Sequence, residues 1–172
     1  MPPTSDIRIR LLTPADAALF RLIRLEALEV NPEAFASTLE RERDLPVTQF
    51  EQRLATADVF GAFVDDTLMG VAGFRRHDGR KSAHKADLWG MYVRSAARKT
   101  GLGKRLIDAV LAHAAERVEQ LHLTVISDNA GAVRLYESAG FVEYGRLPRG
   151  LKQDGWYSDE ILMARFFTGS DR

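Results

Sequence analysis

The chain has 172 residues, which is enough for one domain with a full hydrophobic core and too few for two domains of ordinary size. Hydrophobic residues make up 45% and charged residues 28%, as in an ordinary globular protein. The formal net charge is zero, so no overall field attracts nucleic acid or an anionic membrane, and we expect neither partner. Residues 1–172 are therefore predicted to form a single domain with its core at about 7–167.

The absence of cysteine limits the chemistry that this chain can perform. Disulfide bonds and a cysteine nucleophile are both excluded, and no serine lies in a Gly-x-Ser-x-Gly elbow. No apolar run resembles a signal peptide or is long enough to cross a membrane, so we expect a cytoplasmic protein. Whether it is a monomer or a homodimer is left open.

The chain begins with a predicted strand and helix. Residues 7–11 alternate apolar and basic side chains, as a half-buried strand does. Thr13 is a suitable N-cap and Pro14 a suitable first helical residue. Apolar residues then continue on one face until Asn31-Pro32 ends the helix.

A second helix and a hairpin are predicted next. The helix is expected at 46–57 because its apolar residues lie four apart. Two strands, at 59–64 and 68–74, flank the polar turn Asp65-Asp66-Thr67. Residues 75–85 are polar and predict a loop.

A glycine-containing segment, Arg98-Lys99-Thr100-Gly101-Leu102-Gly103-Lys104, separates a predicted strand at 88–93 from an amphipathic helix. The apolar face of that helix consists of Leu102, Leu106, Ile107, Val110, Leu111, Ala114, Ala115 and Val118. Glycines and bases at a helix start expose backbone N–H groups at the positive end of the helix dipole, which favours phosphate. A solvated turn is the alternative, and the spacing fits neither a Walker loop nor a dinucleotide fingerprint.

A second motif begins at Asn129, after a strand-like run at 121–126. Together the two motifs resemble the GCN5-related N-acetyltransferase (GNAT) family of acetyl-CoA-dependent transferases. The first is similar to Val-x4-Gln/Arg-x-x-Gly-x-Gly/Ala, with Val93, Arg98, Gly101 and Gly103 in register. The second is similar to Asn-x-x-Ala-x-x-Leu-Tyr-x-x-x-Gly-Phe, with Asn129, Ala132, Leu135, Tyr136, Gly140 and Phe141 in register. The matched core spans about 88–141, and the expected fold extends over 7–167.

The order of the elements predicts an α/β mixed sheet with helices on both faces. Two closing strands, at 141–147 and 156–167, are expected around a loop at 148–155. The resemblance implies the acyl-CoA N-acyltransferase fold, whose mostly antiparallel sheet has a parallel fourth and fifth strand that splay apart. The pantetheine arm of acetyl-CoA would lie in that gap, against the backbone of the strand that ends at Val93.

The resemblance also assigns the residues that would bind acetyl-CoA. They are Tyr92, Val93, Arg98, Lys99, Thr100, Gly101, Leu102, Gly103, Lys104, Asn129, Ala132 and Tyr136. Backbone amides of the glycine loop would hold the pyrophosphate while Arg98 braces the loop. Lys99 and Thr100 stand where the family often has glycine and then a base, so this chain departs from the family's pattern in the details of the phosphate contact but not in its location. Asn129 also suits the N-cap of its helix.

Tyr136 matches the family's general acid, placed to meet the sulfur of the departing thiolate. Transfer of an ordinary tyrosine proton to that thiolate is uphill by about 2 kcal/mol. We therefore expect a hydrogen bond that strengthens as negative charge builds on the sulfur. The alternative is an aromatic side chain that only packs in the core.

The general base is less well defined by the sequence. Several family members use a glutamate eleven residues before the motif's Gln/Arg, where this chain has Asp87. Aspartate is one methylene shorter, so a bridging water would be needed, and a solvated bystander is an equal alternative. His84 is a second candidate base. His77, Asp78, His84 and Asp87 match no standard metal spacing, so we expect no metal.

The amine acceptor is not identified by the sequence. The fold would place it between the first two helices and the loop joining the last two strands. Candidate contacts are Phe35, Glu40, Glu42, Trp89, Arg149, Lys152, Asp154 and Tyr157. We predict acetyl transfer from acetyl-CoA to a primary amine, on a small molecule, by direct attack in a ternary complex. A protein α-amine or lysine is the alternative acceptor, and a non-catalytic acyl-CoA sensor is the alternative of another class.

Overall fold

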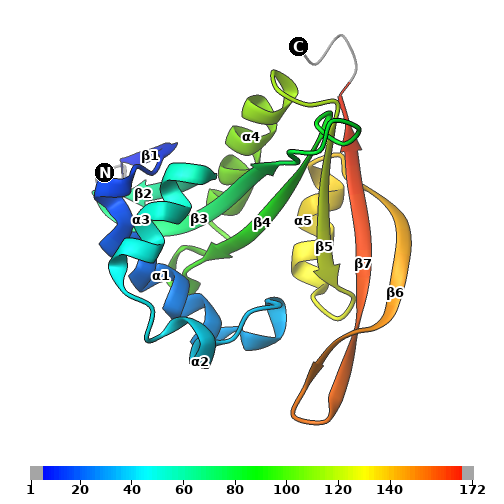
Figure 1. Ribbon diagram of the computed structural model, residues 1–172, viewed down its shortest axis with the longest axis horizontal. Helices are drawn as coiled ribbons and strands as arrows, with labels where there is room; N and C mark the ends of the chain where they lie inside the picture. Colours follow the sequence, from blue (N-terminus) through cyan, green and yellow to red (C-terminus); the bar gives the residue numbers. More distant parts are fainter. Residues whose placement is uncertain (1–5, 168–172) are drawn as a thin grey trace.

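The computed structural model describes residues 6–167, which form one mixed sheet with helices on both faces (Figure 1). The sheet has seven strands in the order β1-β2-β3-β4-β5-β7-β6. Their bounds are β1 (Ile7–Leu11), β2 (Asp58–Val64), β3 (Thr67–Arg76), β4 (Lys85–Val93), β5 (Gln120–Ile126), β6 (Val142–Gln153) and β7 (Trp156–Phe166). Only the β4–β5 pair is parallel within this sheet. The predicted mixed, mostly antiparallel sheet is confirmed.

The helices divide between the two faces of the sheet. They are α1 (Ala17–Val30), α2 (Leu39–Glu42), α3 (Val47–Thr56), α4 (Leu102–Ala115) and α5 (Ala130–Ser138). One apolar cluster joins α1 and α3 to the sheet, and a larger one joins α4 and α5 to the opposite face. The amphipathic face predicted for α4 is buried, with Leu102, Leu106 and Val110 fully inside the core.

The N-terminal predictions hold with a local correction. Thr13 caps a 3₁₀ turn, Pro14–Asp16, that leads into α1. The turn is fixed by the Asp16 carboxylate, which accepts hydrogen bonds from Thr13 N at 2.8 Å and from the Arg10 guanidinium at 2.8 Å. In the β2–β3 hairpin, Asp65 and Asp66 alone form the turn, both with positive φ, and Thr67 already belongs to β3.

The predicted loop at 148–155 is wrong. The β6 strand continues to Gln153 and turns into β7 at Asp154-Gly155, both of which have positive φ. The register of β6 shifts between Leu147 and Leu151, and this irregularity includes Pro148. The segment was not predicted as a strand because its side chains are mostly exposed, so no apolar alternation marks it. The short helix α2 was also missed.

The two parallel strands separate after three residue pairs. β4 and β5 are in register at Lys85–Gln120, Ala86–Leu121 and Asp87–His122. Beyond Asp87, β4 contains an irregularity around Gly90, which has φ +61°. Figure 1 shows the two strands diverging below their paired ends. The predicted splayed pair is therefore present, and it opens the sheet at its centre.

Candidate active site

A cleft of about 780 Å³ occupies the gap between the diverging strands. Its wall combines the second half of β4, the second half of β5, the start of α4, one side of α5 and the segment after α1. Both sequence motifs meet there, although about thirty residues separate them in the chain. Of the residues predicted to bind acetyl-CoA, those lining the cleft are Tyr92, Val93, Arg98, Lys99, Gly101, Gly103, Lys104, Asn129, Ala132 and Tyr136.

The glycine loop forms the start of α4 as the sequence predicts. Gly101 is the N-cap residue, with φ +85°, and a Cβ added there would have no atom within 4 Å. Gly103 lies in the first turn, where a Cβ would stand 3.4 Å from Leu135 of α5. Its lack of a side chain lets the two motif helices approach closely. Thr100 and Leu102 do not line the cleft: the Thr100 hydroxyl donates to Ala97 O at 2.7 Å, and Leu102 is fully buried.

Arg98 ties the glycine loop to two other parts of the cleft. Its Nε donates to Val93 O at 2.9 Å, and its Nη2 donates to Asn31 Oδ1 at 2.7 Å. The guanidinium also lies over the ring of Tyr92, 5.6 Å from its centroid. Arg98 therefore joins the end of β4, the start of α4 and the end of α1.

The Tyr92 side chain is committed to the protein interior. Its hydroxyl donates to Glu26 Oε1 at 3.0 Å, and Arg94 Nε donates to the other oxygen of Glu26 at 2.9 Å. Burial and the neighbouring Glu26 raise the pKa of the tyrosine. Its contribution to a ligand in the cleft is therefore limited to its backbone.

Asn129 caps α5 at the other side of the cleft. Its Oδ1 accepts a hydrogen bond from Ala132 N at 3.1 Å, which confirms the predicted N-cap. Both residues line the cleft.

Tyr136 projects from α5 into the same cleft. The residue is 7% exposed, and its ring packs edge-on against Phe141 with centroids 5.9 Å apart. No hydrogen bond within residues 6–167 uses its hydroxyl. Burial raises the pKa of the phenol well above its ordinary value, so at neutral pH the hydroxyl remains protonated. Tyr136 thus offers the cleft an O–H donor with no other partner in this part of the chain.

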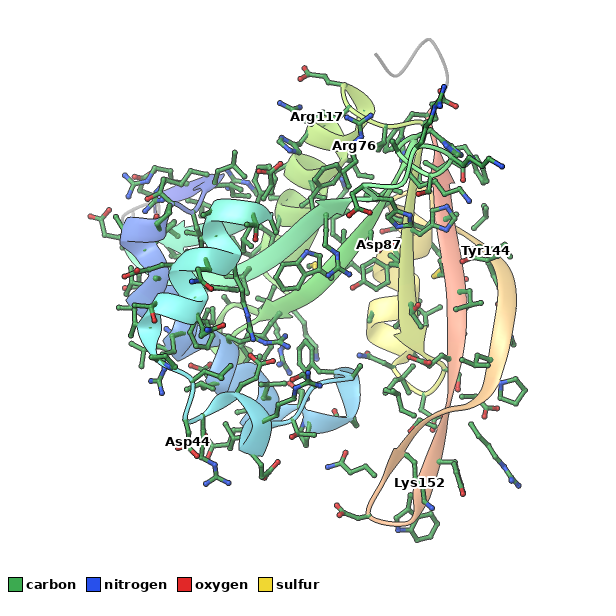
Figure 2. All side chains as sticks on the ribbon, in the orientation of Figure 1. Asp44, Arg76, Asp87, Arg117, Tyr144 and Lys152 are labelled. Carbon is green, nitrogen blue, oxygen red and sulfur yellow. The ribbon has the colours of Figure 1, made fainter. Side chains whose placement is uncertain are left out.

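Asp87 lies at the end of the gap where β4 and β5 are still paired. The next residue of β4, Leu88, is the first residue of that strand that lines the cleft. Its Oδ2 is 3.0 Å from His77 Nε2 and 3.9 Å from Arg75 Nη2. Figure 2 shows Asp87 on β4 near the upper part of the sheet, with Tyr144 on the edge strand β6 at the right. His122, the partner of Asp87 across the parallel ladder, has its Nδ1 3.3 Å from the Tyr144 hydroxyl.

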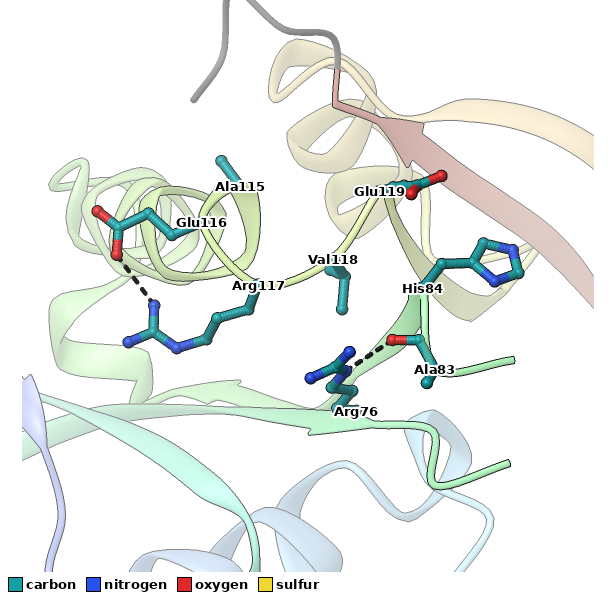
Figure 3. A pocket seen from close by; sticks show the side chains of 8 residues that line it. All are labelled: Arg76, Ala83, His84, Ala115, Glu116, Arg117, Val118 and Glu119. Atoms are coloured by element: carbon teal, nitrogen blue, oxygen red, sulfur yellow. Dashed lines mark hydrogen bonds and ion pairs between the residues drawn. The ribbon is translucent and has the colours of Figure 1, made fainter. Parts of the chain in front are cut away.

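His84 lines a different cavity. This second pocket, of about 300 Å³, lies between the end of α4, the end of β3 and the start of β4, and Arg76 and Arg117 extend into it (Figure 3). The backbone oxygen of His84 accepts hydrogen bonds from Glu119 N and Gln120 N. Among residues 6–167, no three His, Cys, Asp or Glu side chains are grouped so that they could hold a metal ion.

The predicted acceptor contacts fall into four groups. Phe35 and Trp89 line the cleft, whereas Glu42 is buried beneath it. Glu40 is exposed and pairs with Arg43 at 3.7 Å. The remaining four lie on the β6–β7 hairpin, where Arg149 and Lys152 stand over the ring of Tyr157; Figure 2 shows Lys152 at the hairpin's far end.

Among the residues of this region that were not predicted are Asn31, after α1, and Gly90 of β4, which line the cleft, and Arg24 of α1, which lies beside Gly90. The sequence carries a weak signal for Asn31, since Pro32 follows it, and for Gly90, since glycine within a strand often marks an irregularity. Nothing local distinguishes Arg24 from the other charged residues of an amphipathic helix.

Comparison with known proteins shows which family this chain resembles. The model of the acetyltransferase (GNAT) family matches residues 22–141. Mycothiol acetyltransferase of Thermobispora bispora is 33% identical over 142 residues, covering 80% of this chain and 47% of the relative. The chain thus spans less than half the length of that relative.

Two further proteins are similar over nearly their whole lengths. N-alpha-acetyltransferase RimI of Mycobacterium tuberculosis is 32% identical over 165 residues, covering 94% of both chains. The structure of Salmonella typhimurium yncA with its cofactor acetyl-CoA superposes with a TM-score of 0.81 at 21% identity, covering 95% of both chains. The second likeness concerns the fold alone. On the family match and the identity to RimI, the chain belongs to the GNAT family of acetyltransferases.

Proposed function

We propose that this protein transfers the acetyl group of acetyl-CoA to the primary amine of a small molecule, by direct attack while both substrates are bound. The observation that carries the proposal is the cleft between β4 and β5, because the glycine loop and Tyr136 both line it. A small-molecule acceptor is supported by the similarity to mycothiol acetyltransferase. We place the reaction in the cytoplasm, where acetyl-CoA is available.

The proposed position of acetyl-CoA follows from the parts of the backbone that lack a strand partner. Because the β4–β5 ladder ends at Asp87, the stretch 88–93 of β4 has no hydrogen bonds to β5. The pantetheine arm can pair with this stretch as a strand would. Its pyrophosphate would then lie over the N-terminus of α4, where backbone N–H groups around Gly101 to Lys104 favour an anion.

Tyr136 is proposed to stabilise the leaving group. The neutral amine nitrogen forms a bond to the acetyl carbon, the C–S bond breaks, and the electron pair of that bond remains on the thiolate. The surplus proton on the nitrogen is then lost to solvent, which leaves the neutral amide. Since burial raises the pKa of Tyr136, full proton transfer to sulfur is less favourable than for an ordinary tyrosine. The hydroxyl therefore acts through a hydrogen bond that strengthens as charge builds.

Asp87 is proposed to take the proton from the attacking ammonium group through a bridging water. The carboxylate is adjacent to the closed end of the cleft, and its contact with His77 gives the proton a second acceptor.

A protein N-terminus is the second candidate acceptor, favoured by the similarity to RimI over the whole of both chains. Thiol release from acetyl-CoA, measured with a panel of small amines and N-terminal peptides, tests both candidates. Amine-dependent release with small amines supports the proposal, and release with peptides alone replaces it with the second candidate. Acetyl-CoA binding without thiol release for any amine would instead indicate a non-catalytic sensor.

A further inference from the structure

Two charged residues are buried within residues 6–167, and both lie beneath one wall of the cleft. Arg24 of α1 is 8% exposed and Glu42 of α2 is 2% exposed. Arg24 Nε and Nη2 donate to the two oxygens of Glu42 at 3.2 and 2.9 Å. This bidentate pair uses one side of the guanidinium.

A second cation shares the same carboxylate. Arg53 of α3 donates from Nη1 to Glu42 Oε2 at 2.7 Å. Burial opposes ionisation of Glu42, but hydrogen bonds from Arg24, Ser37 and Arg53 lower its pKa to about 2. Two arginines thus balance one carboxylate, which leaves the group with a net charge of +1.

The unused end of the Arg24 guanidinium lies beside Gly90 and Phe35, two residues that line the cleft, although Arg24 itself is not part of the cleft's wall. No hydrogen bond in the described part of the chain uses Nη1 of Arg24, and a Cβ added at Gly90 would lie 3.7 Å from that atom. The ring of Phe35 covers the guanidinium at 5.2 Å. Gly90 and Phe35 both line the cleft. The free N–H groups of Arg24 Nη1 therefore lie next to Gly90, the glycine at the irregularity of β4, where no side chain covers them.

We infer that Arg24 binds a carboxylate of the acceptor at this point, so that the substrates are small amines bearing a carboxylate, α-amino acids above all. This inference rests on the proposed function. The outer N–H groups of Nη1 and Nη2 can grip a second carboxylate end-on while Glu42 keeps its own bonds. In an α-amino acid the amine and the carboxylate share one carbon atom. A carboxylate held beside Gly90 thus keeps the amine next to the β4 backbone proposed to carry the thioester.

The test compares each amino acid with its own carboxamide, using thiol release from acetyl-CoA by the wild-type protein. The two acceptors share the amine and the side chain and differ in the charge that Arg24 would bind. We expect kcat/KM to be about a hundredfold lower for the carboxamide, because the carboxylate forms a charge-assisted bidentate pair with the guanidinium. Calorimetry with the CoA-loaded protein should show the same preference in the Kd of the free amino acid.

Arg24→Lys keeps the positive charge but removes the paired N–H donors of the guanidinium. The ratio of kcat/KM for the acid to that for the carboxamide should therefore fall to about tenfold or less, mainly through a higher KM for the acid. Arg53→Lys is the matched control, because Arg53 contacts the same Glu42 but its guanidinium lies over Phe50 instead of Gly90. It should keep the preference.

Equal kcat/KM for acids and carboxamides in the wild type would overturn the inference while leaving the proposed acetyl transfer intact. Absence of thiol release with every amine, in a protein that binds acetyl-CoA, would instead overturn the proposed function. If Arg24→Lys fails to fold, the comparison of acid with carboxamide in the wild type still decides the question.

Discussion

Asp87 and His122 stand opposite each other as the last pair of the parallel β4–β5 ladder. The side chain of each also contacts a further residue, His77 for Asp87 and Tyr144 for His122. Burial, with the nearby Lys85, lowers the pKa of His122, so that imidazole is neutral at pH 7. The proposed base is therefore held where the strands begin to separate, beside a histidine that adds no positive charge.

Replacing Asp87 with asparagine tests the base. We expect the rate to fall about a hundredfold at neutral pH and to recover partly at high pH, because more of the amine is then already deprotonated. The measurement is a complete pH–rate profile for both proteins. Asp66→Asn, in the exposed β2–β3 turn, is the control and should match the wild type. Parallel profiles for Asp87→Asn and wild type at every pH would show that Asp87 takes no part.

Tyr136→Phe removes the unpartnered hydroxyl while keeping the ring that packs on Phe141. Turnover should fall roughly ten- to a thousandfold with acetyl-CoA affinity unchanged, because the hydroxyl contacts sulfur only as charge develops there. Single-turnover kinetics and calorimetry measure the two quantities. Wild-type turnover in Tyr136→Phe would reduce Tyr136 to a packing residue.

Gly101→Leu tests the proposed pyrophosphate position, and Gly155→Leu is its matched control. Both glycines have φ near +85°, and neither has an atom within 4 Å of an added Cβ. The backbone strain should therefore be similar, about 1–2 kcal/mol in each variant. Only the leucine at 101 would stand in the cleft, so only that variant should lose CoA affinity by calorimetry. Equal CoA affinity in the two folded variants would show that the pyrophosphate binds elsewhere.

Glu42→Gln tests the buried ion group through its pH dependence. The pKa of Glu42 is about 2 in the folded protein against an ordinary 4.5, so its stabilising effect is complete above pH 4.5. That effect is lost as the pH falls from 4.5 towards 2. At pH 7 the variant should be less stable by about 3 kcal/mol or more, since an arginine is left unpaired.

Urea unfolding at several pH values measures this difference, which should shrink below pH 4.5. Asp16, whose carboxyl pKa is also held low by Arg10, is present in both proteins and cancels in the comparison. A difference in unfolding free energy that stays constant from pH 7 to pH 3 would contradict the predicted pKa of Glu42.

Most of the fold could be predicted because its signals are local. The apolar face of α4, the Thr13 cap and the Asp65-Asp66 turn each depend on residues within one or two turns of the chain. The second half of β6 could not be predicted, because it is solvated and Pro148 interrupts it. Its strand conformation depends on pairing with β7, which no single segment encodes.

The cofactor half of the candidate site was predictable for the same reason, since each motif is a continuous run of residues. The acceptor half was not. Arg24 receives its partner from a helix eighteen residues away, and its neighbour Gly90 comes from the middle of the sheet. Glu42 was named as a possible acceptor contact, but its carboxylate is already paired with Arg24 and Arg53.

The irregular path of β6 has a consequence for how the molecule behaves among other chains. As the last strand of the sheet, β6 could present a row of unpaired N–H and C=O groups to which a foreign strand could add. Two register shifts, after Glu143 and after Leu147, break that row into short pieces. Pro148 removes one donor altogether. The edge strand β6 therefore resists edge-to-edge aggregation with other sheets.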